Sequence, residues 1–442
     1  MRLPEHICQC INKLEAAGYA VYTVGGCVRD DYLGRTPHDF DLCTSALPEE
    51  TEAIFAEYPL QLEGKQHGTI RVVTEAEVVE ITTFRMEGPY SDNRHPDWVR
   101  FVPQVEADLA RRDFTINAMA WSPTRGYADP FQGREDLENG LLRTVGDPEV
   151  RFREDSLRIL RCVRFAARYG LKLEEKTERA MIRLAPLLDN LAKERVFDEL
   201  NRILPLLTFQ DLQRFAPVLT QVIPELRPMV NFDQRSPHHA YDLYTHVAHV
   251  VDKMPDDLTL RWAALLHDVG KVPTCTLDET GRGHFKGHAP VGARMAADIL
   301  DRFRAPTALK NQVVTLIANH MLRLKPDRIP LKRQLNMLGW ETVWQCLTLQ
   351  EADMSSKGVP NREELLQYAQ TRQILLRLEE EKACVTIKEL AVGGRDLMDL
   401  GIRGKEVGQT LQTLLEQVLT EKTENTKEAL LGYLKSQTGA AT

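Results

Sequence analysis

Two aspartates separated by one residue, Asp39 and Asp41, have the type and spacing needed for metal-assisted chemistry. On a strand, side chains two residues apart share one face, so both carboxylates project together while Phe40 points into the core. Adjacent carboxylates are costly unless cations hold them, and oxygen ligands on one face suit Mg²⁺. The pair therefore predicts a magnesium site that supports phosphoryl or nucleotidyl transfer.

A glycine turn precedes the aspartates and is suited to hold phosphate. The apolar run 20–24 predicts a buried strand, Gly25 and Gly26 follow it, and the pattern over 28–33 predicts a short helix. Backbone N–H groups at such a turn point outward, and glycine leaves room for a phosphate. Gly26 and the nearby Arg29 are therefore candidate phosphate ligands. A Gly-Gly turn or an Asp-x-Asp pair alone is common, but their order and spacing favour the functional interpretation.

The stretch 21–42 closely resembles the signature of the tRNA nucleotidyltransferase and bacterial poly(A) polymerase family, the class II branch of the polymerase-β-like nucleotidyltransferases. The resemblance implies an α/β head in which Asp39 and Asp41 bind Mg²⁺. Glu80 lies in the middle of a predicted strand. It lies either on a solvated face or beside the two aspartates as a third carboxylate, which this superfamily often uses, and we favour the second interpretation.

A second motif, ARRDFTINAMA at residues 110–120, predicts a buried element that presents polar side chains on another face. Arg112 could bind triphosphate oxygens, and Asp113 or Asn117 could bond a ribose hydroxyl. The motif closely matches one with which the family holds the nucleotide and favours ribose over deoxyribose. Upstream of it, residues 85–100 predict a loop by composition, and the resemblance associates a loop there with addition of the final adenosine.

Residues 151–168 have helical spacing and contain six arginines against two acidic residues. On a helix, Asp155, Arg158 and Arg161 would share one face. Arginine can donate to the ring nitrogen of cytosine or adenine and Asp155 can accept from the exocyclic amine, whereas uracil and guanine present the opposite pattern. A solvated basic helix face is the structural alternative. The stretch resembles the family's base-selecting motif, which implies that Asp155 and Arg158 choose the base, with Arg161 and Arg164 in support.

Histidines and aspartates recur in a fixed order farther along the chain. They are His246, His267, Asp268, His288, His320 and Asp353. Any one such histidine is more often a core or surface residue than a ligand, but adjacent His267 and Asp268 with ordered partners are a specific signal. The order resembles that of the HD phosphohydrolase superfamily, which implies binding of divalent metal such as Ni²⁺ or Mn²⁺. The resemblance assigns His246, His267, Asp268 and Asp353 to one metal and His288 and His320 to a second.

We therefore predict an α+β protein with four parts. They are a polymerase-β-like nucleotidyltransferase α/β head (1–140), an all-α neck with base-selecting and tRNA-binding motifs (141–232), an HD domain (236–360) and a helical tRNA-binding tail (361–442). In the neck, the stretch 193–204 resembles the family's last motif and predicts a structural helix. In the tail, residues 404–408 predict a helix start that could take an RNA phosphate, although an ordinary helix cap fits equally well.

The resemblance implies template-independent addition of CCA to the 3′ end of tRNA from CTP and ATP, with an additional HD phosphohydrolase activity on phosphoesters such as 2′,3′-cyclic phosphates. The nearest alternatives are a poly(A) polymerase and an enzyme that adds only CC or only A. Bacterial poly(A) polymerases usually carry a basic segment where this chain has Gly64-Lys65-Gln66-His67-Gly68, which disfavours them. A rival of another class is phosphohydrolysis at the HD domain as the main activity.

The composition agrees with this prediction and limits how the chain can bind RNA. The chain has 442 residues, 43% hydrophobic residues and a net charge of −8, so it is long enough for several domains and must concentrate basic residues locally to bind RNA. Eight cysteines form no CxxC pair and predict reduced core residues of a cytoplasmic protein. No apolar run approaches membrane-spanning length.

Overall fold

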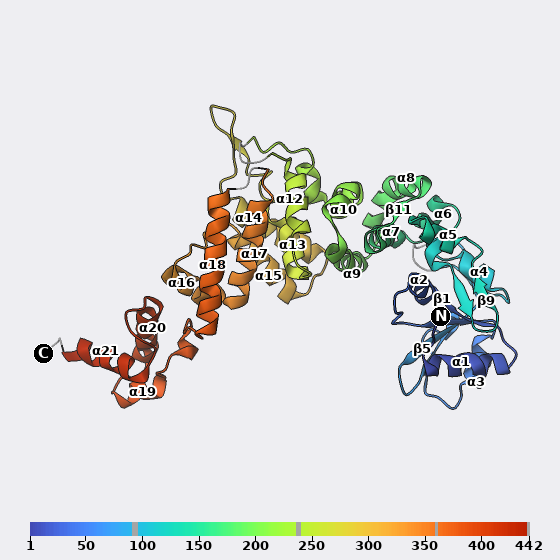
Figure 1. Cartoon of the computed structure of the whole chain (residues 1–442), viewed down its shortest axis with the longest axis horizontal. Helices are drawn as coiled ribbons and strands as arrows, with labels where there is room; N and C mark the ends of the chain where they lie inside the picture. Colours follow the sequence, from blue (N-terminus) through green and yellow to red (C-terminus); the bar gives the residue numbers. More distant parts are fainter. Residues whose placement is uncertain (91–95, 236–239, 359–360, 440–442) are drawn as a thin grey trace. The chain divides into compact units, whose positions relative to one another are not determined.

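The computed structural model describes residues 1–90, 96–235, 240–358 and 361–439. The chain forms two compact units, Met1–Pro224 and Glu225–Thr442. The predicted α+β class is confirmed, because the first unit contains a mixed sheet and helices make up most of the second (Figure 1). None of the helices in these ranges is long and apolar enough to cross a membrane.

The first unit is built on a seven-stranded sheet with the order β3-β4-β5-β2-β1-β8-β9. Its strands are β1 (Val21–Val24), β2 (Asp41–Thr44), β3 (Leu60–Gln61), β4 (Thr69–Val73), β5 (Val78–Thr83), β8 (Ala120–Ser122) and β9 (Gly126–Ala128). β2 and β5 pair in parallel, and the other neighbouring strands pair antiparallel. The parallel register sets Leu42 opposite Ile81, and therefore places Asp41 beside Glu80.

Helices surround this sheet and continue beyond it. They are α1 (Glu5–Ala16), α2 (Gly26–Tyr32), α3 (Pro48–Ile54), α4 (Val105–Ala110), α5 (Gly133–Glu138), α6 (Pro148–Glu154), α7 (Leu157–Tyr169), α8 (Glu175–Leu184), α9 (Lys193–Ile203), α10 (Phe209–Arg214) and α11 (Ala216–Val222). Two small sheets join β6 (Arg85–Glu87) to β7 (Val99–Phe101) and β10 (Leu141–Leu142) to β11 (Lys172–Leu173). The 3₁₀ segments of the chain are η1 (Lys65–His67), η2 (Thr115–Asn117), η3 (Ala185–Asn190), η4 (Leu204–Leu206), η5 (Pro224–Met229) and η6 (Ile387–Glu389).

Alternation along the strands gives the large sheet two different faces. Leu42 and Ile81 are buried on one face, and α1 and α3, which contact strands β1, β4 and β5, lie together against the sheet (Figure 1). On the other face Cys43 packs in one core with Leu109 of α4. Asp41 lies two residues before Cys43, on that same face, and is exposed. The fold therefore presents this acid to solvent at the end of a buried strand.

The predicted single helix over 151–168 is wrong at one point, because the chain forms two helices there, α6 and α7. Between them Asp155 is extended, with φ −140° and ψ 104°, and its carboxylate accepts a hydrogen bond from the backbone N–H of Leu157. An aspartate bonded to the backbone two residues ahead competes with the helix and favours a new helix start. Asp155 therefore precedes α7 and does not share a helix face with Arg158 and Arg161.

The predicted loop over 85–100 is partly structured. Its ends pair as the antiparallel strands β6 and β7, with Arg85 opposite Phe101. Residues 91–95, in the middle of the predicted loop, lie outside the described residues. Gly, Pro and Asp in this stretch predicted irregular backbone, but composition alone did not reveal the two strands that begin and end it.

The second unit is a helical bundle followed by a smaller helical group. The helices are α12 (Leu243–Asp252), α13 (Leu258–Leu266), α14 (His288–Arg302), α15 (Thr307–Asn319), α16 (Arg328–Leu338), α17 (Trp340–Ser355), α18 (Arg362–Glu380), α19 (Gly394–Asp399), α20 (Lys405–Leu419) and α21 (Lys427–Gly439), and the hairpin joins β12 (Thr276–Leu277) to β13 (Gly283–His284). Helices α12, α13, α15 and α17 contact one another around buried residues such as Trp262. The helix start predicted at 404–408 coincides with the beginning of α20.

The cysteines form no disulfide bonds. All eight are free thiols, and six of them are buried. Burial raises the pKa of several of these thiols, including that of Cys10 to about 11. The cysteines therefore act as protonated, apolar core side chains in this fold.

Candidate active site and metal centre

Carboxylates gather at the exposed end of β2. Asp41 opens this strand beside Glu80 of β5, and Asp39 lies two residues earlier. The side chain of Asp41 reaches solvent, but neighbouring protein atoms remove part of its hydration, and this loss and the negative charge of Glu80 raise its pKa; Asp39 adds to this rise and Arg112 opposes it. Glu80 accepts a hydrogen bond from Arg71 Nε at 2.7 Å. Carboxylates this close repel one another and gain from a bound cation, so the donor set fits a divalent metal such as Mg²⁺.

The glycine turn lies against Arg112. Gly25 has a φ of +78°, the left-handed conformation that favours glycine. A Cβ atom on Gly25 would come within 3.0 Å of Arg112 Nη1. Arg112 Nε is buried and has no hydrogen-bond partner in the described part of the chain. The guanidinium therefore has donor capacity left beside the turn, where a phosphate group would satisfy it.

Four other predicted nucleotide ligands form one chain of hydrogen bonds. Arg29 donates to Asn117 Oδ1, Asn117 Nδ2 donates to Asp113 Oδ1 at 3.1 Å, and Arg161 donates twice to Asp113 Oδ2 at 2.8 and 2.6 Å. Burial alone would raise the pKa of Asp113, but the charge of Arg161 and the Asn117 hydrogen bond lower it to about 2. Arg29, Asp113 and Asn117 are at most 7% exposed. Their contact with a nucleotide stays a prediction, and here their polar atoms hold the protein together.

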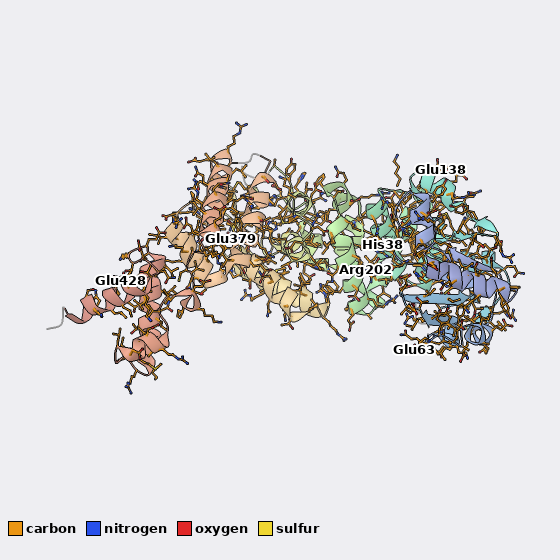
Figure 2. All side chains as sticks on the ribbon, turned by 60° about the horizontal axis from the view of Figure 1, so that its bottom comes forward. His38, Glu63, Glu138, Arg202, Glu379 and Glu428 are labelled. Atoms are coloured by element: carbon orange, nitrogen blue, oxygen red, sulfur yellow. The ribbon has the colours of Figure 1, made fainter. Side chains whose placement is uncertain are left out.

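Two cavities are lined by residues from the motif at 110–120 and from the stretch 151–168. One of about 340 Å³ is lined by Arg111, Arg112, Asp113, Asp155, Leu157, Arg158, Arg161 and Arg195. Another of about 560 Å³ shares Arg111, Asp155 and Arg158 and extends to Glu80 and to Glu63, which is labelled in Figure 2. Because the cavities share residues, the predicted base-selecting pair, Asp155 and Arg158, and the acidic strand end open onto neighbouring space. Their arginines give this space the charge that an anionic ligand requires.

Other protein groups hold both Arg158 and Asp155, the predicted base-selecting pair. Arg158 Nη1 donates to Glu154 Oε2 at 2.6 Å, and its Nη2 donates to the Arg111 carbonyl at 3.2 Å. Asp155 is bonded by Arg195 of α9, whose Nη2 is 3.4 Å from Oδ1 and 3.3 Å from Oδ2. The sequence identified α9 only as a structural helix and gave no signal for Arg195. The contact of Arg195 with Asp155 could be identified only from the structure, in which α9 packs against α7.

Arg164 points to a partner inside the protein and lines neither of these two cavities. Its Nε donates to Glu199 Oε1 at 2.5 Å, and the two side chains are 11% and 3% exposed. A buried ion pair between α7 and α9 is the role that this geometry supports. The predicted supporting role of Arg164 in base selection stays a prediction.

We expect the substitution Arg164→Met to destabilise the first unit by about 3 kcal/mol, because it leaves the buried Glu199 carboxylate unpaired. Urea unfolding monitored by circular dichroism measures the loss in the transition of that unit. Adding Glu199→Gln to Arg164→Met should recover part of the stability, since the uncompensated charge is then removed. Equal stability of Arg164→Met and the unsubstituted protein would contradict the assignment.

All six predicted HD residues converge in the second unit. His246 lies in α12, His267 and Asp268 follow α13, His288 begins α14, His320 follows α15 and Asp353 lies in α17. They form two groups that share Asp268, one with His246, His267 and Asp353 and one with His288 and His320, and in each group the donor atoms lie within 4.8 Å of one another. Five helices thus bring together residues that are far apart in the sequence.

Asp268 lies between the two groups. Its Oδ2 is 3.2 Å from His267 Nε2 and 3.7 Å from His246 Nε2. Its Oδ1 is 3.6 Å from His288 Nε2 and 3.8 Å from His320 Nε2. Each carboxylate oxygen therefore faces a different pair of imidazoles, which is the geometry of a ligand shared between two ions.

The backbone orients three of these imidazoles. Nδ1 of His267, His288 and His320 lies 2.8, 2.8 and 2.6 Å from the carbonyl three residues earlier. Donation from Nδ1 leaves the Nε2 lone pair facing Asp268. Burial lowers the pKa of His320 to about 4 and also lowers that of His288, so both are neutral as metal ligands must be. His267 Nε2 is buried without a hydrogen-bond partner among the described residues, and a divalent metal fits there.

Three family models match this chain. Residues 21–143 match the poly A polymerase head domain, and residues 238–356 match the HD domain. Residues 170–227 match a probable RNA and SrmB-binding site of polymerase A. The matches cover the carboxylates, the glycine turn and the histidine cluster described above.

Known proteins resemble the chain over nearly its whole length. The CCA-adding enzyme of Geobacillus thermodenitrificans is 34% identical over 447 residues, which covers 96% of this chain and 95% of that protein. The CCA-adding enzyme of Leuconostoc mesenteroides is 47% identical over 194 residues, and this match spans about half of each protein, 44% of this chain and 48% of the relative.

A solved structure agrees with these matches. The crystal structure of Bacillus stearothermophilus CCA-adding enzyme in complex with CTP is 29% identical, has a TM-score of 0.71, and covers 100% of this chain and 99% of that one. The predicted resemblance is confirmed at the level of sequence and fold, because the relatives and the solved structure match nearly the whole chain. The chain belongs to the family of CCA-adding enzymes.

Proposed function

We propose that this chain adds CCA to the 3′ end of tRNA, using CTP and ATP and no nucleic-acid template. The observation that carries the proposal is the pair of adjoining cavities that joins Asp155 and Arg158 to Glu80, which lies beside Asp41. A base-selecting pair and a metal-binding acidic cluster are the two things that such a reaction needs. The full-length relatives named CCA-adding enzymes and the related structure determined with CTP support the same activity.

Two side chains would select the base. Asp155 can only accept hydrogen bonds when ionised, so it pairs with the exocyclic amine that cytosine and adenine share. Arg158 can only donate, so it pairs with the adjacent ring nitrogen of either base. Uracil and guanine would place a carbonyl against the carboxylate and an N–H against the guanidinium. A site built this way rejects them because buried polar groups would stay unpaired.

The reacting groups would lie at the other end of the cavities. Asp39 and Asp41 would hold the divalent ions of the head, with Glu80 as a third acid and Mg²⁺ as the ion that suits these oxygen donors. Such ions, when bound, activate the tRNA 3′-hydroxyl and neutralise charge on the triphosphate. Arg112 would hold a phosphate oxygen beside the turn at Gly25 and Gly26. These positions orient the triphosphate while Asp155 and Arg158 hold the base.

An incorporation assay tests the proposal. The purified protein is incubated with Mg²⁺, each nucleoside triphosphate singly and in mixture, and tRNA transcripts that end before the tail, after C and after CC. We expect products that stop at CCA, with no use of UTP or GTP. Products that stop at CC would assign the chain to CC addition, a long adenosine ladder would assign it to poly(A) synthesis, and no incorporation would overturn the proposal.

We also propose that the HD cluster binds two divalent ions, such as Ni²⁺ or Mn²⁺, and hydrolyses phosphoesters, including 2′,3′-cyclic phosphates. The observation that favours this second function is Asp268, whose two oxygens face separate pairs of histidines. Neutral imidazoles and carboxylates are ligands that these ions accept. Two ions close together are suited to activate water and to hold a phosphoryl group.

We expect the substitution Asp268→Asn to reduce bound Mn²⁺ or Ni²⁺, measured by mass spectrometry after dialysis, by at least one ion per chain. Hydrolysis of a 2′,3′-cyclic nucleotide should fall with the metal, while CTP addition stays within about twofold, because metal binding and hydrolysis depend on the cluster. His284→Gln is the matched control, since this exposed histidine lies on the β12–β13 hairpin and outside the cluster. Unchanged metal content in Asp268→Asn would contradict the assignment.

A further inference from the structure

Arg195 contacts the carboxylate to which base selection is assigned. Its Nη2 lies 3.4 Å from Asp155 Oδ1 and 3.3 Å from Oδ2, so it bridges both oxygens. Arg195 and Asp155 line the same cavity of about 340 Å³. The two residues are 40 positions apart, and Arg195 belongs to α9 while Asp155 precedes α7. A separate helix therefore sets the direction in which this carboxylate points.

The other contacts of Asp155 show which acceptor positions of its carboxylate stay available to a base. Oδ1 accepts from the backbone N–H of Leu157 at 3.1 Å as well as from Arg195. Oδ2 accepts only from Arg195 within the described part of the chain. A carboxylate has about four acceptor positions. Oδ2 therefore keeps acceptor capacity for the amine of a bound base, at an orientation that Leu157 and Arg195 fix together.

Attachment of α9 to α7 does not depend on Arg195. The buried pair Arg164–Glu199 joins the same two helices, and Val196, Phe197 and Leu200 are buried on α9. Arg195 is half-buried, with 24% of its side chain exposed, and its ion pair is with Asp155. Other residues therefore already pack α9 against α7, and the contribution of the Arg195 contact is to orient the Asp155 carboxylate.

We propose that Arg195 is a positioning residue for base selection, which holds the Asp155 carboxylate in the orientation that accepts the exocyclic amine of cytosine or adenine. The inference rests on the proposed function, since it deepens the role given there to Asp155. Without Arg195 the carboxylate is held by a single backbone hydrogen bond and can turn about its terminal torsion, which is broad in aspartate. The amine then loses a pre-oriented acceptor, and discrimination falls.

The test compares CTP with UTP and with the 4-deamino analogue of CTP, which lacks the amine. Single-turnover addition to tRNA ending before the tail gives kcat/KM for each triphosphate. We expect Arg195→Met to reduce the preference for CTP over both competitors by about tenfold, the effect of one charge-assisted hydrogen bond. Arg195→Lys should keep part of the preference for CTP, because lysine retains a hydrogen-bond donor but lacks the planar guanidinium group of arginine.

Arg202→Met is the matched control, since Arg202 lies on the same helix two turns later and is exposed (Figure 2). It should keep the CTP preference of the unsubstituted protein. The Tm values of all variants should agree within about 3 °C, which is the shift that about 1 kcal/mol causes in a unit of this size.

Two outcomes for the Arg195→Met variant would overturn the inference. Arg195→Met could lower kcat/KM for CTP, UTP and the analogue by the same factor, which would indicate a general structural role, or it could leave all three unchanged. Failure of the unsubstituted protein to incorporate CTP would overturn the proposed function and this inference with it. Normal CTP incorporation with an unchanged preference in Arg195→Met would overturn the inference alone.

Discussion

Replacing Asp41 by asparagine should reduce nucleotide addition by at least about 10³-fold. Asparagine keeps the shape of the side chain but removes the negative charge that a divalent ion needs at the end of β2. Loss of a metal ligand at a reacting centre costs several kcal/mol of transition-state stabilisation, and about 4 kcal/mol corresponds to 10³ in rate. The fold should be unaffected, because Asp41 is exposed and has like charges at Glu80 and Asp39 nearby. Single-turnover CTP incorporation into tRNA measures the effect.

Glu75→Gln serves as the matched control. Glu75 is an exposed acid between β4 and β5, away from the cavities, and its substitution should leave CTP incorporation unchanged. Cyclic phosphodiesterase activity should survive in Asp41→Asn, since the HD cluster lies in the other compact unit. Addition that persists within about tenfold of normal would show that Asp41 is not a metal ligand. Loss of both activities would instead indicate unfolding.

The strands around this acidic cluster were predictable in part, and their pairing was not. Alternation of apolar residues predicted strands around Asp41 and Glu80, but β2 begins at Asp41, so Asp39 lies outside the strand and the period of two does not set the direction of its side chain. Which strands become neighbours depends on contacts between residues far apart in the chain. The parallel pairing of β2 with β5 brings Glu80 beside Asp41, and only the resemblance, not the pattern, suggested it.

The break at Asp155 shows a local signal that periodicity obscured. The run of apolar residues and arginines over 151–168 fits a helix, but Asp155 and Ser156 are residues that favour helix starts. The backbone N–H of Leu157 bonds to Asp155, so the sequence itself contained the reason for the break. By contrast, nothing local pairs Arg195 with Asp155 or Arg164 with Glu199, because periodicity does not tell which helix faces meet.

The six residues of the HD cluster and their division into two groups were predicted from the resemblance, but the orientation of the imidazoles was not. The order of histidines and aspartates identified the six side chains that the bundle brings together. The orientation of Nε2 in His267, His288 and His320 arises from a hydrogen bond between Nδ1 and the carbonyl three residues earlier, which lies in the helix for His267 and His320 and in the turn before the helix for His288. That placement depends on where helices start and stop, the least predictable feature of a sequence.

Replacing Asp155 by asparagine should lower the preference for CTP over UTP by about 10²-fold. The amide oxygen can keep the hydrogen bond from the Leu157 N–H, while the amide N–H₂ replaces an acceptor by a donor. Cytosine then loses a hydrogen bond to its amine, and uracil gains one to its carbonyl. Each hydrogen bond that involves a charged group is worth about 1.5–3 kcal/mol, so the two changes together correspond to about 10² or more. Competition between CTP and UTP for one tRNA primer measures the ratio.

Asp147→Asn provides a control with the same chemistry at another helix start. Asp147 is the N-cap of α6, whereas Asp155 lies one residue before the N-cap of α7, and each carboxylate accepts a hydrogen bond from the backbone N–H two residues ahead. Asp147 lines neither of the two cavities that Asp155 and Arg158 line. Asparagine caps helices as well as aspartate, so neither variant should lose stability through the cap. Asp147→Asn should keep full discrimination. If Asp155→Asn slows CTP and UTP equally, the carboxylate does not contact the base, and selection must depend on Arg158 alone.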